Sequence, residues 1–142
     1  MAIFYLLPQQ SGNGYVSYSP VNNQYGTKQT IETIMQIAGD YFRNQQIQIQ
    51  IGDMSYEKGA PMPPHHTHTD GKCVDIRPIR KDKKLMPVNF HQDTYDRSAT
   101  ELLVQALLSH KNVKKILFND TNIKGVHWFQ GHDNHLHVTF YH

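Results

Sequence analysis

The chain has 142 residues, a length that fits one compact domain with a hydrophobic core of its own. Its formal net charge at pH 7 is only +2, and apart from the solvated run at residues 80–84 its basic residues are scattered, which argues against a nucleic-acid partner. The single cysteine, Cys73, excludes an internal disulfide, and no apolar stretch is long enough to span a membrane. We therefore expect a single domain over residues 1–142, with no nucleic-acid partner and no membrane span.

The N-terminal half contains one predicted helix among short predicted strands. Apolar side chains recur at helical spacing over residues 27–42, which predicts an amphipathic helix. Isoleucine alternates with glutamine over residues 46–51, a pattern typical of a strand with one buried face. Asn13-Gly14 predicts a turn between two further extended segments, at residues 3–7 and 15–19.

A loop and a strand follow in the middle of the chain. Glycine and prolines exclude regular structure from residues 57–64, so the histidines that come next are expected on a loop. The segment CVDIRPI then returns to a strand, with Asp75 and Arg77 on one face and Val74 and Ile76 on the other. Asp75 is therefore expected to point away from the apolar layer.

The C-terminal half begins with a second predicted helix. It is expected over residues 98–110, with Ser98 as its N-terminal cap. Its buried side chains are expected to be Leu102, Leu103, Ala106 and Leu107. A strand at residues 113–119, a turn at Lys124-Gly125 and a C-terminal strand complete the chain. Helices and strands interleave irregularly and the later strands are joined closely, which favours an α+β fold with a mainly antiparallel sheet flanked by helices.

Histidine is the anomaly of the composition, since six of the ten histidines lie in two short segments. In the C-terminal segment, His135 and His137 alternate along a strand and therefore project from the same side. In the other segment, His68 precedes Asp75 by seven positions, with the flexible TDGK stretch between them. Zinc in hydrolytic sites usually takes three nitrogen or oxygen ligands from the protein and keeps a fourth position for water. His68, Asp75 and His137 fit this pattern, so we expect one zinc ion per chain, with His135 beside it as a base.

Hydrolysis of an amide needs a nucleophile, a stabilised oxyanion and a proton for the leaving amine. Zinc lowers the pKa of bound water toward ~7 and helps to stabilise the oxyanion. His135, titrating near neutrality, is expected to shuttle the proton, and His132 is the second catalytic candidate. His132 and His65 are also candidate donors to the oxyanion.

Three more side chains are candidates for supporting roles. Asp133 is a candidate for orienting an imidazole through its second ring nitrogen. Arg77 is expected either to hold a substrate carboxylate or, the favoured interpretation, to form a surface ion pair. Trp128 is expected either to form the wall of a cleft or to lie in the core.

Several segments of the chain resemble the penicillin-insensitive murein endopeptidases. They are LLPQQSGNGYVSY, IGDMS, HHTHTDGKCVDIR, VKKILFND and WFQGHDNHLHVTF. That family is grouped with lysostaphin, D-Ala-D-Ala peptidases and hedgehog-type zinc proteins, so the resemblance implies a fold of the hedgehog and D-Ala-D-Ala peptidase type. It implies zinc ligands at His68, Asp75 and His137 and a catalytic role for His135. It also implies peptidoglycan peptides as substrate, with D-Ala-containing cross-links as the bonds cut by an endopeptidase or a carboxypeptidase.

Two functions of other classes remain open at this point. Residues 65–67 and 137–139 are both His-x-Thr, a pattern that also occurs in metal-independent two-histidine phosphoesterases. A zinc-binding module without catalytic activity is the other alternative, for which the hedgehog-type proteins are a precedent.

The first ten residues lack the basic start and the long apolar core of a signal peptide. We therefore expect a protein that is cytoplasmic as synthesised. A site of action in the periplasm or cell wall would then need a separate access route, as a phage lysin has.

Overall fold

The computed structural model describes residues 3–9 and 14–141 of the chain. Over these residues the elements in chain order are β1 (Tyr5–Leu6), β2 (Tyr15–Ser17), a short 3-10 helix (Val21–Asn23), β3 (Tyr25–Gly26), α1 (Lys28–Gln45), β4 (Ile49–Ile51), β5 (Cys73–Ile76), α2 (Arg97–Leu108), β6 (Val113–Leu117), β7 (Val126–His127) and β8 (Leu136–Phe140). The predicted helices and strands are present, although most strands are shorter than predicted. Asn13 of the predicted turn lies outside the described residues.

Six strands form one sheet, in the order β2-β4-β5-β8-β6-β7. Its three inner pairs are antiparallel, whereas the outer pairs β2–β4 and β6–β7 are parallel. The pair β2–β4 is parallel because α1 lies between the two strands in the chain and forms a crossover connection. The structure therefore confirms an α+β fold with a mainly antiparallel sheet. Its likeness to the hedgehog and D-Ala-D-Ala peptidase folds stays a prediction.

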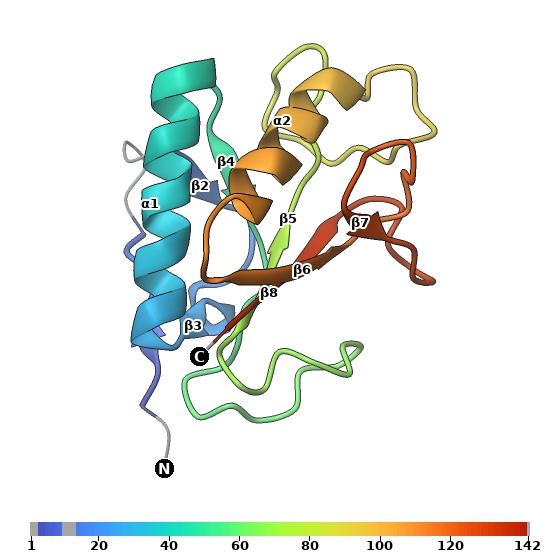
Figure 1. The fold of residues 1–142 in the computed structure, drawn as a ribbon. Coiled ribbons are helices and arrows are strands. Elements are labelled where there is room, and N and C mark those ends of the chain that lie inside the picture. The colour runs from blue at the N-terminus through green and yellow to red at the C-terminus, as the bar shows by residue number, and fades with distance from the viewer. Residues whose placement is uncertain (1–2, 10–13, 142) are drawn as a thin grey trace.

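The two helices pack against each other and cover one face of the sheet (Figure 1). The side chain of Thr27 caps α1 by accepting a hydrogen bond from the backbone N–H of Thr30. The helix ends at Gln45, and the C-cap residue Gln46 adopts the left-handed conformation common at helix C-termini. The Tyr41 hydroxyl donates a hydrogen bond of 2.9 Å to the carbonyl oxygen of Ala99 and so joins α1 to α2.

The N-terminus and the buried face of α2 differ from the prediction. Asp96, not Ser98, is the N-cap, and its carboxylate accepts a hydrogen bond from the backbone N–H of Ala99. Leu102 is 44% exposed, whereas Val104 is fully buried. The buried face consists of Ala99, Thr100, Leu103, Val104 and Leu107. These positions follow the three- and four-residue spacing of one helix face, which leaves Leu102 on the outside.

The strand β4 is not the half-buried strand that the alternation of isoleucine and glutamine predicts. All three of its residues are buried, including Gln50, which is 3% exposed. The strand lies inside the sheet between β2 and β5. In addition, the Gln50 side chain accepts a hydrogen bond of 3.2 Å from Arg77, so the polar face of the strand is covered as well.

The central strands β5 and β8 place a carboxylate on the face of the sheet opposite the helices. Val74 and Ile76 are fully buried in the core. Asp75 alternates with them and points to the other face, as predicted, although it is also buried. Cys73 is a buried free cysteine.

Gly71 holds the loop between β4 and β5 against the N-terminal part of the chain. Its φ is +72°, and its carbonyl oxygen accepts a hydrogen bond of 3.0 Å from the backbone N–H of Thr27. A Cβ at this position would lie 2.9 Å from the Thr27 nitrogen and 2.8 Å from the Phe4 ring. The turn therefore requires glycine for both its conformation and its close contacts.

We predict that Gly71→Ala lowers the free energy of unfolding by at least about 2 kcal/mol, because left-handed strain adds to overpacking. Gly131→Ala is the matched control: its φ is +87°, but no atom lies within 4 Å of the added Cβ. Gly131→Ala should lower the free energy of unfolding by only the conformational part of this loss, about 1 kcal/mol. Urea denaturation measures both losses, and equal losses would contradict the packing argument.

Candidate metal centre

The two central strands of the sheet bring Asp75 and His137 together. These residues lie directly opposite each other in the β5–β8 register, an arrangement that holds cross-strand Cβ atoms about 4.5–5.5 Å apart. His137 Nδ1 lies 3.3 Å from Asp75 Oδ1, and both side chains are buried. The hydrogen bonds of the sheet therefore position both side chains.

His68 reaches the same carboxylate from the loop before β5. Its backbone is left-handed, with a φ of 67°, and its side chain is fully buried. Nδ1 lies 2.6 Å from the carbonyl oxygen of Met54, which can only accept, so Nδ1 carries a proton and donates it. In the neutral ring Nε2 is then an acceptor: it lies 3.3 Å from Asp75 Oδ1 and has no hydrogen-bond partner within the described part of the chain.

With the His68 ring neutral, these two acceptors face each other in a buried site and repel each other unless a proton or a metal cation lies between them. The site therefore favours positive charge, and its ionisation agrees with this. Burial alone would raise the pKa of Asp75, but His137 and His68 outweigh burial and hold that pKa well below its usual range. Burial would lower the pKa of His68, but Asp75 raises it above the ordinary value. Imidazole nitrogens and a carboxylate oxygen are ligands that zinc takes in proteins, so these residues fit the expected ion.

His65 supplies another imidazole at the edge of this cluster. Its Nε2 lies 2.8 Å from Asp53 Oδ2 and 3.9 Å from Asp75 Oδ2. Ligand atoms of His65, His68 and Asp75 all lie within 4.8 Å of one another. His68 and Asp75 are thus common to two candidate ligand sets, one completed by His65 and the other by His137.

The two candidate catalytic histidines lie beside this centre, on the segment before β8. The ring centroids of His132 and His135 are 4.6 Å apart, and His132 lies 5.8 Å from His137. His135 Nδ1 lies 2.8 Å from Asn134 Oδ1, so Nδ1 donates and Nε2 stays free to accept.

The environment of His135 changes its expected ionisation. Burial lowers the pKa of His135 to about 4; Asp75 opposes this shift, and His132 and His137 add to it. The expectation that His135 titrates near neutrality is therefore wrong. At pH 7 the ring is neutral, which is the form that can take up a proton.

The segment between β7 and β8 is held in place by Asn119, which follows β6. The Asn119 side chain accepts a hydrogen bond of 2.9 Å from the backbone N–H of Phe129 and donates one of 2.8 Å to Asp133. Its backbone N–H donates to the carbonyl oxygen of His132 at 2.9 Å. Asp133 therefore lies against Asn119, and its other oxygen is 3.4 Å from His91.

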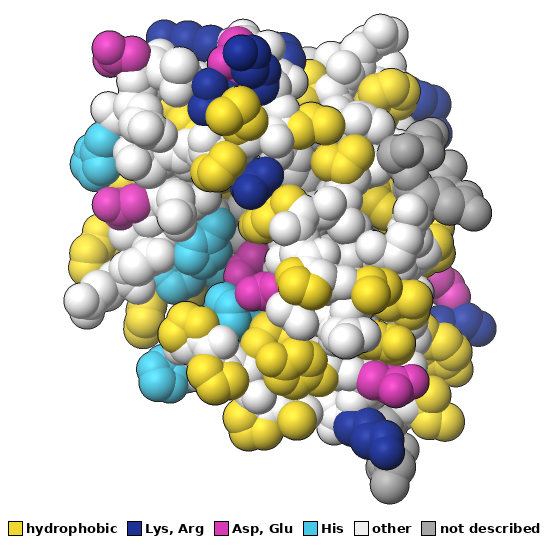
Figure 2. Space-filling view, turned by 180° about the vertical axis from the view of Figure 1, so that it is seen from behind, with side chains coloured by type: hydrophobic (Ala, Val, Ile, Leu, Met, Phe, Trp, Pro, Cys, Tyr) yellow, Lys and Arg dark blue, Asp and Glu magenta, His cyan; other side chains and the backbone are white. Residues whose placement is uncertain are grey.

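The cluster opens onto a cleft on the face of the sheet away from the helices. His and acidic side chains gather in a hollow of this face (Figure 2). The cleft lining includes Tyr18, Asp53, His65, Asp75, Arg77 and His135. Arg77 forms no ion pair with any described carboxylate. The side chain of Trp128 is 62% exposed, so Trp128 does not belong to the core.

Sequence reasoning missed three contributors to the site. Asp53, which bonds to His65, also accepts a hydrogen bond of 3.0 Å from Asn23, and its position just after a buried strand was the available signal. Asn119, at the end of a predicted strand, carried the same signal. The third contributor, the carbonyl oxygen of Met54, belongs to the backbone and leaves no signal in the sequence.

A buried cluster of imidazoles and a carboxylate in an open cleft is typical of a metal-dependent hydrolase. Comparison with known families agrees: the family of penicillin-insensitive murein endopeptidases matches residues 5–124. The chain therefore belongs to this family, which confirms the resemblance in its motifs. The match includes His68 and Asp75 and ends before His132. No similar protein was found among the curated proteins.

Family membership makes the protein a hydrolase of the peptidase type, with peptidoglycan as its substrate. Family membership also favours the peptidase interpretation over the alternative of a two-histidine phosphoesterase. Among the described residues, no helix has the length and apolar character needed to cross a membrane.

We predict that in the metal-free protein the His135 imidazole titrates with a midpoint near pH 4, because burial disfavours its charged form. The imidazole chemical shifts of His135, followed by NMR against pH, measure the midpoint. A midpoint near the ordinary value of 6.5 would show that the ring is not desolvated.

Proposed function

We propose that the protein is a zinc-dependent peptidase that hydrolyses amide bonds in D-Ala-containing cross-links of murein. The observation that carries this proposal is the buried Nε2 of His68, which has no hydrogen-bond partner among the described residues and faces the carboxylate of Asp75, a residue that lines the cleft. In a chain of the murein endopeptidase family, a buried pair that favours a cation supports a metal-dependent reaction.

His68, Asp75 and His137 are the proposed ligands of one zinc ion per chain. The distances to Asp75 support this set, because His68 and His137 each approach the same oxygen of Asp75 to 3.3 Å, although the ligand atoms that all lie within 4.8 Å of one another are those of His65, His68 and Asp75. His65 lies farther away, at 3.9 Å from the other oxygen, and its Nε2 is engaged by Asp53 at 2.8 Å. We therefore place His65 at the rim of the site, as a supporting residue.

When bound, zinc supplies Lewis-acid activation of water and of the substrate carbonyl. His135 lines the cleft with a neutral ring, so its Nε2 can take a proton from the attacking water and pass it to the leaving amine nitrogen. The Nδ1 of His132 donates to the carbonyl oxygens of Phe129 and Gln130, each at 3.1 Å. His132 therefore stacks beside His135 with its own Nε2 free to bind substrate.

We predict that His68→Ala or His137→Ala abolishes tight zinc retention, because each removes one of three ligands. His66→Ala is the control, since His66 is exposed and should leave zinc content unchanged. Elemental analysis of protein purified without added metal gives the stoichiometry. If His137→Ala keeps one zinc as tightly as the parent while His65→Ala loses it, the third ligand is His65.

The proposed activity predicts that zinc-loaded protein releases un-cross-linked muropeptides from purified sacculi, detected by mass spectrometry, and that a chelator stops the release. His135→Ala should retain zinc but lose turnover by ~100-fold or more, because it removes the proton shuttle. His66→Ala should keep parental turnover. The proposal is wrong if zinc-loaded protein cuts neither sacculi nor soluble D-Ala peptides, or if the chelated protein stays active.

A further inference from the structure

Arg77 lies in the same cleft as the metal centre but has no part in the proposed chemistry. It follows Asp75 by two positions, and its half-buried side chain lines the cleft together with His65 and His135. Its backbone N–H donates to the carbonyl oxygen of Gln50 at 3.1 Å, which extends the contact of β5 with β4. The charge of Arg77 is therefore placed by the sheet, close to the reacting groups.

The guanidinium group of Arg77 is held by two neutral partners. It stacks on the Tyr18 ring, with 3.8 Å between the guanidinium carbon and the ring centroid, and it donates a hydrogen bond of 3.2 Å to the buried Gln50 side chain. Tyr18 in turn lies so close to Gly52 that a Cβ there would be 2.4 Å from the ring. These contacts limit the positions open to the side chain and prepare it for a ligand.

Among the described residues, Arg77 differs from the other three arginines in lacking an acidic partner. Arg43 pairs with Asp40, Arg80 with Asp82 and Arg97 with Asp120. No carboxylate of the described residues pairs with Arg77. A partly desolvated cation without an anion is unfavourable, and its remaining N–H groups are directed donors that match the two oxygens of a carboxylate.

We infer that Arg77 binds a carboxylate of the murein peptide and so sets which peptides the cleft accepts. This inference rests on the proposed function. The carboxylate is either the C-terminal α-carboxylate of the peptide or a free carboxylate on one of its internal residues. Since Arg77 makes this contact away from the scissile amide, it is a specificity residue, and its effect should fall mainly on KM.

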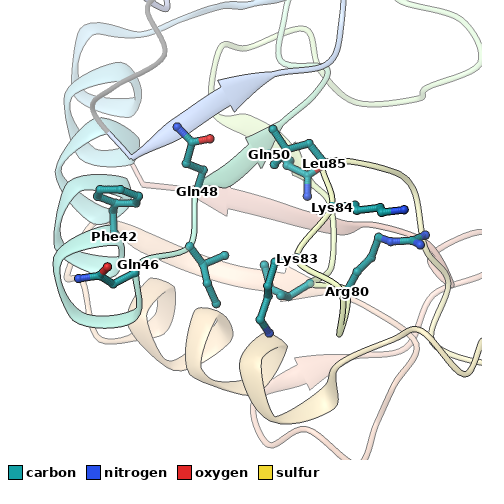
Figure 3. Close-up of a pocket in the computed structure, with 10 residues that line it drawn as sticks. Phe42, Gln46, Gln48, Gln50, Arg80, Lys83, Lys84 and Leu85 are labelled. Atoms are coloured by element: carbon teal, nitrogen blue, oxygen red, sulfur yellow. The ribbon is translucent and has the colours of Figure 1, made fainter.

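A second pocket provides a matched control. Gln50, the partner of Arg77, also lines this neighbouring pocket together with Lys84 (Figure 3). Lys84 is exposed and does not line the cleft of the metal centre. Both Lys84→Met and Arg77→Met therefore remove one positive charge near the cleft. Only Lys84→Met leaves the guanidinium group of Arg77 in place.

The experiment uses a soluble cross-linked peptide in which each free carboxylate is converted in turn to a primary amide. In the parent, one of these amides should lower kcat/KM by about 10- to 100-fold, mainly through KM, because a charge-assisted contact is lost. The position of that amide identifies which carboxylate Arg77 binds. Arg77→Met should cut the free and amidated forms equally, and Arg77→Lys should recover part of the discrimination. Lys84→Met should discriminate like the parent.

Zinc content is measured for every variant, so that loss of the metal is not mistaken for loss of the contact. The inference is overturned if the parent cuts free and amidated peptides equally, or if Arg77→Met still discriminates between them. A uniform fall in activity on all peptides would mean that Arg77 is only structural. If the parent cuts no peptide, the proposed function fails, and equilibrium binding of free and amidated peptides to the parent and Arg77→Met then decides the inference alone.

Discussion

The whole site depends on one buried carboxylate oxygen. Asp75 Oδ1 lies 3.3 Å from His68 Nε2 and 3.3 Å from His137 Nδ1. Burying a carboxylate is costly unless opposite charge or hydrogen-bond donors compensate for the lost water. The cross-strand register, the left-handed backbone of His68 and the hydrogen bond from His68 to the Met54 carbonyl oxygen all serve to bring imidazole nitrogens to that oxygen.

The features that the sequence predicts well are those that depend on local periodicity. Alternation along a strand placed Asp75 on the face opposite Val74 and Ile76, and the structure agrees. Helical spacing located both helices, since an amphipathic helix repeats its apolar side chains within a few residues. Asp75 and His137 lie close together for a different reason, because β5 and β8, which are far apart in the chain, pair at the centre of the sheet.

The features that the sequence predicts poorly depend on residues far away in the chain. Gln50 has a solvent-facing pattern but is buried, because its strand is internal and Arg77 covers its side chain. The lowered pKa of His135 follows from burial in a cleft whose walls come from separate segments. The lack of an ion pair at Arg77 among the described residues has the same origin, since a sequence cannot show which carboxylates come within ion-pair distance of a side chain.

The proposed ligands come from parts of the fold that are held in place in different ways. Asp75 and His137 belong to central strands, whose amide protons can exchange with solvent only after a large part of the sheet has opened. His68 belongs to the long connection between β4 and β5, which contains no regular element of its own. Binding of a metal would therefore slow amide exchange mainly in that connection, where few backbone groups have strand partners. The sheet would then act as a rigid half-site, and the connection would close the coordination by folding onto it.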